Sequence, residues 1–208
     1  MLQPNELSAG LVARFAARGP LTGMRASLLL RSRAALRSRG LLAALDAAMP
    51  AAARRVLEGS SGSEMLDLDV AHDHYQASDG ILSSDAEIVE IGREVGAEHW
   101  NGAMRVVAKL IGGLGATPWV AFERSPRLYE QTMRGGGLEV RRLAERRALV
   151  ELHRNSLCRY RSFAFGLVGS WIGAAEPFAP IRGGIVTRDD DRVSFSLTWD
   201  VPAASRGR

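Results

Sequence analysis

The C-terminal third of the chain carries the pattern that most constrains its fold. Across residues 192–199, apolar side chains alternate with Ser and Thr, as in a strand that buries one face. We predict that the buried face consists of Val193, Phe195, Leu197 and Trp199. Residues 181–188 form a second predicted strand, and three consecutive Asp residues between the two strands favour an antiparallel hairpin.

An earlier pair of segments shows the same organisation. Beyond a triple-glycine turn at 135–137, residues 138–143 and 148–153 are predicted to form another hairpin. An apolar helix at 159–175 separates the two hairpins and ends before Pro177. The order strand, strand, helix, strand, strand predicts an α+β fold, with N-terminal helices packed against a four-stranded antiparallel sheet of ββαββ order.

The first half of the chain has mainly helical spacing. We predict helices at 6–18 and 22–39, and within 41–58 a short helix followed by another that begins at Pro50. A long helix at 85–114 is capped by Ser83 or Ser84. Thr117-Pro118 and Ser125-Pro126 each begin a further short helix.

These elements divide the chain into three parts. Residues 1–58 form an N-terminal helical segment and residues 59–80 an acidic, solvated connection. Residues 81–202 form a helical plus ββαββ region of the ligand-binding kind, and we expect one compact domain overall. A chain of 208 residues with 46% apolar composition can bury a core without disulfides or metals.

Composition excludes several classes of protein. The single cysteine, Cys158, excludes an internal disulfide framework and a multi-cysteine metal site. No stretch reaches 18 apolar residues, and the N-terminus lacks a secretory pattern. We therefore expect a cytoplasmic protein without a transmembrane segment.

The charge distribution is zoned along the chain. Residues 1–58 carry a net charge of +6, residues 59–99 carry −9 and residues 100–208 carry +7. Such zones favour attraction between segments or subunits, or to an external polyanion. Because no groove-reading motif accompanies the arginines, the sequence does not favour a nucleic-acid partner. A polyanion or membrane surface that binds the Arg-rich N-terminal helices stays an alternative.

Common catalytic signatures are missing from the sequence. It contains no nucleophile elbow, P-loop, HExxH or CxxC motif. His72 and His74 could share a face of a strand, but their spacing specifies no third metal ligand, although His99 is available. Cys158 and His153 are the only thiol and imidazole close in sequence. We expect no catalytic residue, metal or cofactor; an enzyme acting on a small hydrophobic substrate is the alternative.

Four segments within residues 82–200 carry a family resemblance: SPRLYEQTMRGGGLEV, ALVELHRNS, FGLVGSWIG and RVSFSLTW. Together they resemble the heme-nitric-oxide-binding, 4-vinyl-reductase and transport-protein-particle superfamily, and are most similar to its bacterial members in the myxobacterial paralogous family. The resemblance implies a regulatory domain that binds a small molecule or a protein.

The heme-binding motif of that superfamily is degenerate here. Heme-binding members carry LHYxSxR, whose Tyr, Ser and Arg hold the heme propionates. The matching stretch, LHRNSLC at 152–158, has Arg154 in place of the Tyr and Cys158 in place of the Arg. The proximal histidine would fall near residues 125–129, which contain no histidine. The resemblance therefore implies a domain that does not bind heme in the family manner.

Two sets of residues are candidates for function. The first would line an apolar cavity between the helices and the sheet, or fill an ordinary core: His99, Trp100, Met104, Trp119, Phe122, Tyr129, His153, Phe163 and Trp171. The second lies along one side of the 159–175 helix: Gly166, Gly169 and Gly173. Each glycine costs a helix about 1 kcal/mol against Ala, so we expect a close approach there by the same chain or by a partner. We thus predict a non-enzymatic regulatory or sensory domain that binds an apolar small molecule or a protein partner, with a homodimer as one possibility.

Overall fold

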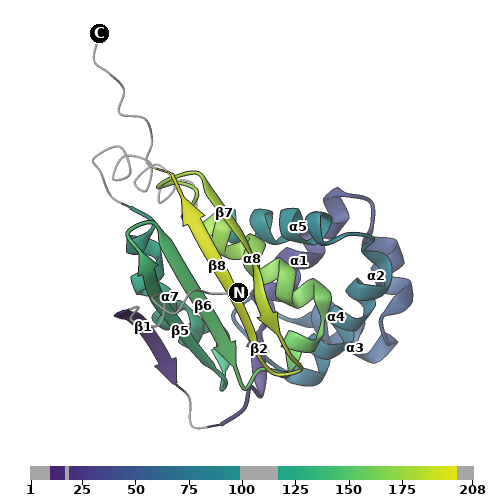
Figure 1. The fold of residues 1–208 in the computed structure, drawn as a ribbon. Coiled ribbons are helices and arrows are strands. Elements are labelled where there is room, and N and C mark those ends of the chain that lie inside the picture. The colour runs from purple at the N-terminus through teal and green to yellow at the C-terminus, as the bar shows by residue number, and fades with distance from the viewer. Residues whose placement is uncertain (1–9, 17–18, 99–116, 201–208) are drawn as a thin grey trace.

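The computed structural model describes residues 10–16, 19–98 and 117–200 (Figure 1). In chain order, its elements are β1 (Gly10–Ala16), β2 (Gly23–Arg25), α1 (Ala26–Ser38), α2 (Leu42–Ala48), α3 (Ala51–Gly59), β3 (Met65–Asp67), α4 (Leu68–Ile81), α5 (Asp85–Ala97), α7 (Trp119–Thr132), β4 (Met133–Arg134), β5 (Gly137–Ala144), β6 (Arg147–His153), the 3-10 helix η2 (Ser156–Arg159), α8 (Arg161–Ala175), β7 (Ile181–Arg188) and β8 (Val193–Trp199).

The main sheet confirms the predicted α+β architecture. Strands β5 and β6, helix α8, and strands β7 and β8 follow one another as predicted, and neighbouring strands are antiparallel in the order β1-β5-β6-β8-β7. The predicted inner face of β8 is buried along its whole length. Val150 of β6 lies opposite both Phe195 of β8 and Val140 of β5, which places three apolar side chains in one row across the sheet.

The sheet has five strands instead of the predicted four because residues 10–16 form a strand, not a helix. Leu11 and Phe15, four residues apart, share a face of a helix. Four is also a multiple of the two-residue period of a strand, so this spacing fits either element. Pairing with β5 along Gly10–Ala16 supplies backbone hydrogen bonds and brings the Phe15 ring within 5.2 Å of the Tyr129 ring of α7.

Most of the segment predicted as an acidic connection forms a helix and a short strand. Residues 68–81 form α4, whose buried face contains Ala71, His74, Ala77 and Ser78 at helical spacing. Two residues of a helix turn about 200°, so His72 and His74 point in different directions instead of sharing the face of a strand. The described residues bring no three His, Cys, Asp or Glu side chains together as a metal site.

Helix α7 continues through the point where we predict a new helix at Ser125-Pro126. Pro126 has no N–H and leaves the carbonyl of Phe122 without its usual donor. The hydroxyl of Ser125 donates to that carbonyl at 2.6 Å, which replaces the missing bond. Of the predicted 85–114 helix, α5 covers the first part, with Ser84 as its cap; residues 99–114 lie outside the described chain.

A second, three-stranded sheet joins the ends of several helices. Its order is β3-β2-β4, and its central strand β2 leads directly into α1. Strand β4 follows α7 without a gap, and Met24 pairs with Met133 in this sheet. The start of α1 and the end of α7 are therefore held side by side.

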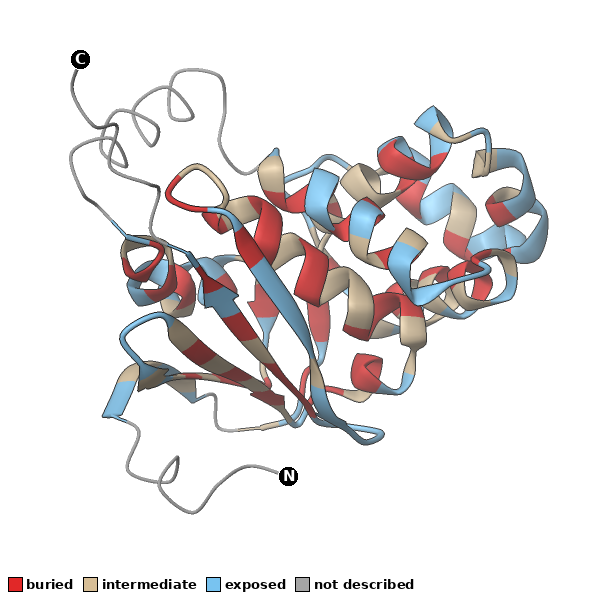
Figure 2. Ribbon diagram, turned by 45° about the horizontal axis from the view of Figure 1, so that its top comes forward, coloured by how far each residue is buried: buried red, intermediate tan, exposed pale blue. Residues whose placement is uncertain are grey.

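The helices cover one face of the main sheet in layers (Figure 1). Helices α7 and α8 both pack on its inner face: Phe122 of α7 and Trp171 of α8 have ring centroids 5.5 Å apart, and Trp171 lies 5.9 Å from Phe195. Helix α5 packs on α8, and α1 to α4 lie farther from the sheet (Figure 2). No helix of the described chain is both long enough and apolar enough to cross a membrane.

Helices α5 and α8 approach backbone to backbone. A Cβ atom at Gly92 or Gly96 would overlap the backbone of α8, and one at Gly169 or Gly173 would overlap the backbone of α5. The close approach predicted for Gly169 and Gly173 is thus made by a helix of the same chain, which leaves no room for a partner helix there. Gly166 differs, because a Cβ atom there would contact only the Ile88 side chain, at 3.9 Å.

Candidate functional site

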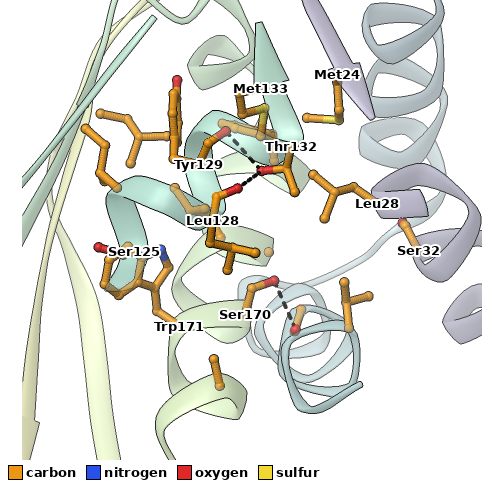
Figure 3. A pocket seen from close by; sticks show the side chains of 18 of the residues that line it. Met24, Leu28, Ser32, Ser125, Leu128, Tyr129, Thr132, Met133, Ser170 and Trp171 are labelled. Carbon is orange, nitrogen blue, oxygen red and sulfur yellow. Dashed lines mark hydrogen bonds between the residues drawn. The ribbon is translucent and has the colours of Figure 1, made fainter. Parts of the chain in front are cut away.

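A pocket of about 720 Å³ lies between α1, α5, α7 and α8 (Figure 3). Its inner wall includes Leu138 and Leu152 of the main sheet. The small sheet contributes Met24 and Met133 at one end, and Ser170 and Trp171 lie toward the other end (Figure 3). Gly92 and Gly166 also line the pocket, at the point where the backbones of α5 and α8 touch.

Few polar groups in the pocket are free to donate a hydrogen bond. The hydroxyl of Ser78 donates to the His74 carbonyl at 2.8 Å, and that of Ser162 donates to the Tyr75 carbonyl at 3.1 Å. Ser170 likewise donates to the Gly92 carbonyl at 3.1 Å. Because backbone carbonyls use these hydroxyls, the interior suits an apolar molecule.

His74 lies directly behind the pocket wall. Its Nε2 shares a 3.1 Å hydrogen bond with the hydroxyl of Ser32, which lines the pocket. Complete burial, assisted by the positive charge of Arg33, lowers the pKa of His74 to about 3. The imidazole is therefore neutral at physiological pH and supplies no charge to the pocket.

His72 belongs to a different polar cluster. Its Nε2 lies 3.0 Å from the hydroxyl of Ser156, and its Nδ1 lies 3.0 Å from the hydroxyl of Tyr160. Burial and the nearby Arg159 lower the pKa of His72. The cluster ties α4 to the segment that links β6 to α8, and none of these residues lines the pocket.

The structure brings four of the predicted cavity residues to this pocket: Phe122, Tyr129, Phe163 and Trp171. His99, Trp100 and Met104 lie outside the described residues. The α1 wall, formed by Leu28, Ser32 and Leu36, is not among the residues predicted from the sequence. Their i, i+4, i+8 spacing was visible, but it indicates only a helix face that packs against something.

Two other predicted residues lie away from the pocket. Trp119 packs its ring 5.0 Å from that of Trp199 and donates its indole N–H to the Glu145 carbonyl at 2.9 Å. His153 follows Leu152 on β6, so the alternation of the strand turns it to the opposite face of the sheet. There its ring covers Gly137, in the space that a side chain at that position would need.

Cys158 is in no state to act as a nucleophile. The side chain is fully buried, and burial, with a smaller contribution from Asp191, raises the pKa of the thiol to about 12. Only the thiolate attacks electrophiles efficiently. The structure thus gives no support to a Cys158–His153 pair as a catalytic site.

The described lining does not fit heme. It contains neither histidine nor cysteine to bind iron. At the positions of the propionate-binding motif, Arg154 is exposed, Ser156 bonds to His72 and Cys158 is buried. Tyr129, on the helix where the proximal histidine would fall, directs its hydroxyl toward Gly136, away from the pocket centre (Figure 3).

Comparisons with known proteins give a match only at the level of structure. No family model and no curated protein matches the chain. An oxygen-binding H-NOX domain related to soluble guanylate cyclases, solved as its oxygen complex, is 12% identical with a TM-score of 0.54; the match covers 89% of this chain and 100% of that one.

Two further H-NOX structures match similarly. One, solved to probe the function of heme distortion in the H-NOX family, is 13% identical with a TM-score of 0.53, over 89% of this chain and 100% of that one. A mutant of T. tengcongensis H-NOX is 15% identical with a TM-score of 0.53, over 86% and 100%. The expected resemblance to the heme-nitric-oxide-binding branch is confirmed for the fold, whereas the 4-vinyl-reductase, transport-protein-particle and myxobacterial resemblances stay predictions. The chain has an H-NOX-like α+β fold around an apolar pocket.

Proposed function

We propose that the protein is a regulatory domain that binds a small apolar molecule between α1, α5, α7 and α8, without heme. The pocket itself carries this proposal. Protein interiors are close-packed, so a filled aromatic core would leave no space of about 720 Å³. Ligand sites typically have volumes of about 300–1,000 Å³ and mainly apolar linings.

The structural likeness to H-NOX domains supports a ligand-binding role for the interior of the fold. Those proteins are described by their heme and their oxygen complex, whereas the described lining here has neither histidine nor cysteine and no propionate clamp. We infer that this chain uses the interior of the same fold for an apolar ligand of another kind.

A protein partner or homodimer stays a prediction. The exposed large apolar side chains of the described residues lie on four different elements: Leu11, Val56, Leu128 and Val186. Of these, Leu128 also lines the pocket. Scattered apolar residues are normal on protein surfaces and do not point to one docking face.

A cavity-filling variant tests the proposal. Ala121 lines the pocket from α7, so Ala121→Phe places a ring in the ligand space. We expect saturable binding of the neutral dye Nile red, competition by 1-decanol, and at least tenfold weaker binding of both to Ala121→Phe. Ala43→Phe, at an exposed position of α2, is the matched control and should bind as the wild type does.

Unchanged binding to Ala121→Phe would show that the dye occupies another place. No saturable binding of either probe to the wild type would overturn the proposal. Where the wild type binds the probes, native mass spectrometry of protein purified from its own host would identify the natural ligand directly.

A further inference from the structure

We propose that the ligand is a monomeric anionic amphiphile, an alkyl carboxylate of the fatty-acid kind, whose tail fills the pocket and whose head group binds Arg124 and Arg127. This inference rests on the proposed function and assigns the chemical class of its ligand.

The charges around the pocket all have one sign. Among the described lining residues, Arg124 and Arg127 are the only charged side chains, and there is no Asp or Glu. Together with Gln131, they follow an i, i+3, i+7 row along one flank of α7 and are exposed. The neighbouring row, with Ala121 and Leu128, also lines the pocket. The two guanidinium groups therefore belong to its solvent-accessible rim.

These two arginines differ from the ion-paired arginines of the helical part of the molecule. Arg33 pairs with Asp46, Arg39 with Glu94 and Arg93 with Glu176, each at 2.6 Å. Within the described part of the chain, neither Arg124 nor Arg127 has such a carboxylate partner. A guanidinium group binds a carboxylate through two parallel hydrogen bonds. An alkyl carboxylate therefore supplies the acidic partner that the described side chains do not provide for Arg124 and Arg127.

The interior of the pocket determines which way such a ligand must lie. The hydroxyls of Ser78, Ser162 and Ser170 already donate to backbone carbonyls, and the nearby His74 is neutral. A carboxylate buried among them would lose its hydration without gaining donors, which is costly. The tail therefore enters and the head group stays at the arginine rim.

The test compares decanoate with 1-decanol, which has the same chain length but no charge, by isothermal titration calorimetry at low salt and neutral pH. The wild type should bind decanoate about tenfold more tightly than 1-decanol, because exposed charge pairs contribute modestly. Arg124→Gln/Arg127→Gln should remove that difference by weakening decanoate binding while 1-decanol binding stays unchanged. Lengthening the acid to dodecanoate should tighten binding about fourfold per added methylene.

A second double variant controls for net charge. Arg37 and Arg55 are exposed on α1 and α3 and do not line the pocket. Arg37→Gln/Arg55→Gln changes the net charge equally and should keep the preference for decanoate.

Each contrary result has a distinct meaning. Equal wild-type affinity for the acid and the alcohol would overturn the anionic ligand but leave the proposed apolar site standing. A preference for decanoate that survives in the Arg124→Gln/Arg127→Gln variant would overturn the role of these arginines. Absence of binding for both compounds would overturn this inference and the proposed function together.

Discussion

The two sides of helix α8 are packed in opposite ways. Toward α5, Gly169 and Gly173 allow the two helix backbones to touch, and Ser170 adds a hydrogen bond to the Gly92 carbonyl. Toward α7, the same helix presents Leu167 and Trp171 to an open pocket. One helix thus provides both a rigid support and a wall of the binding space.

The largest expected effect comes from filling the closed side. Gly169→Leu forces a side chain against the backbone of α5, which can yield only by moving the whole helix. We expect loss of the folded state, measured by circular dichroism and chemical denaturation. Gly166→Leu makes the same change three residues earlier, where the glycine lines the pocket and a Cβ atom would contact only the Ile88 side chain. It should fold and bind Nile red more weakly, and equal unfolding of both variants would contradict the difference in packing between the two positions.

The side of α8 that rests on the sheet gives the next largest effect. Phe195 is fully buried and lies beside Trp171 of α8. Phe195→Ala should lower the free energy of unfolding by about 3–5 kcal/mol, including the cost of the cavity. Ser196→Ala, on the other face of β8, should be nearly neutral in the same urea titration. A costlier change at Ser196 would show that the strand has another register.

Ser194 should respond to substitution differently from Ser196. Its hydroxyl is buried and lies 2.6 Å from that of Thr187, so Ser194→Ala should cost about 1 kcal/mol instead of being neutral like Ser196→Ala. The alternating pattern of the sequence does not distinguish the two serines; the neighbouring strand β7 does.

An effect between those of Phe195→Ala and Ser194→Ala should appear with pH at the pocket wall. The pKa of His74 falls from 6.5 in the unfolded chain to about 3 in the folded protein, so between these values the unfolded state binds more protons. Stability contributed by the neutral imidazole is complete above pH 6.5 and decreases as pH falls toward 3. Between pH 7.5 and 5 the loss should be about 2 kcal/mol, measured by urea denaturation.

His74→Gln should lose most of this pH dependence, because it removes the group that takes up the proton. His72→Gln provides a comparison at a half-buried histidine and should retain it. An unchanged pH dependence in His74→Gln would assign the effect to other groups.

The sequence predicts the two halves of the molecule unequally well, for physical reasons. Alternation over 193–199 can only suit a half-buried strand, so β8 and its inner face follow directly. At Leu11 and Phe15, a spacing of four fits both helix and strand, and only pairing with β5 decides between them. In α4, the acidic residues indicated a solvated connection, although Ala71, His74 and Ser78 have the spacing of a helix face.

The pocket was predictable only in part. Bulky aromatic residues such as Phe122 and Trp171 identify the region, because they pack between the sheet and helices. The sequence does not show that α1 crosses over to form the remaining wall, since this depends on the small sheet that joins β2 to β4. Nor does it distinguish Arg124 from the other arginines, because ion pairing depends on which helices meet.

The small sheet has a mechanical consequence for the pocket. It joins the N-terminal end of α1 to the C-terminal end of α7 through the pairing of Met24 with Met133. The two walls therefore meet at a pivot, and a change in their separation is smallest there and grows along each helix. The opposite ends of the two helices are Ser38 of α1 and Trp119 of α7. A larger bound ligand would therefore displace these two ends the most.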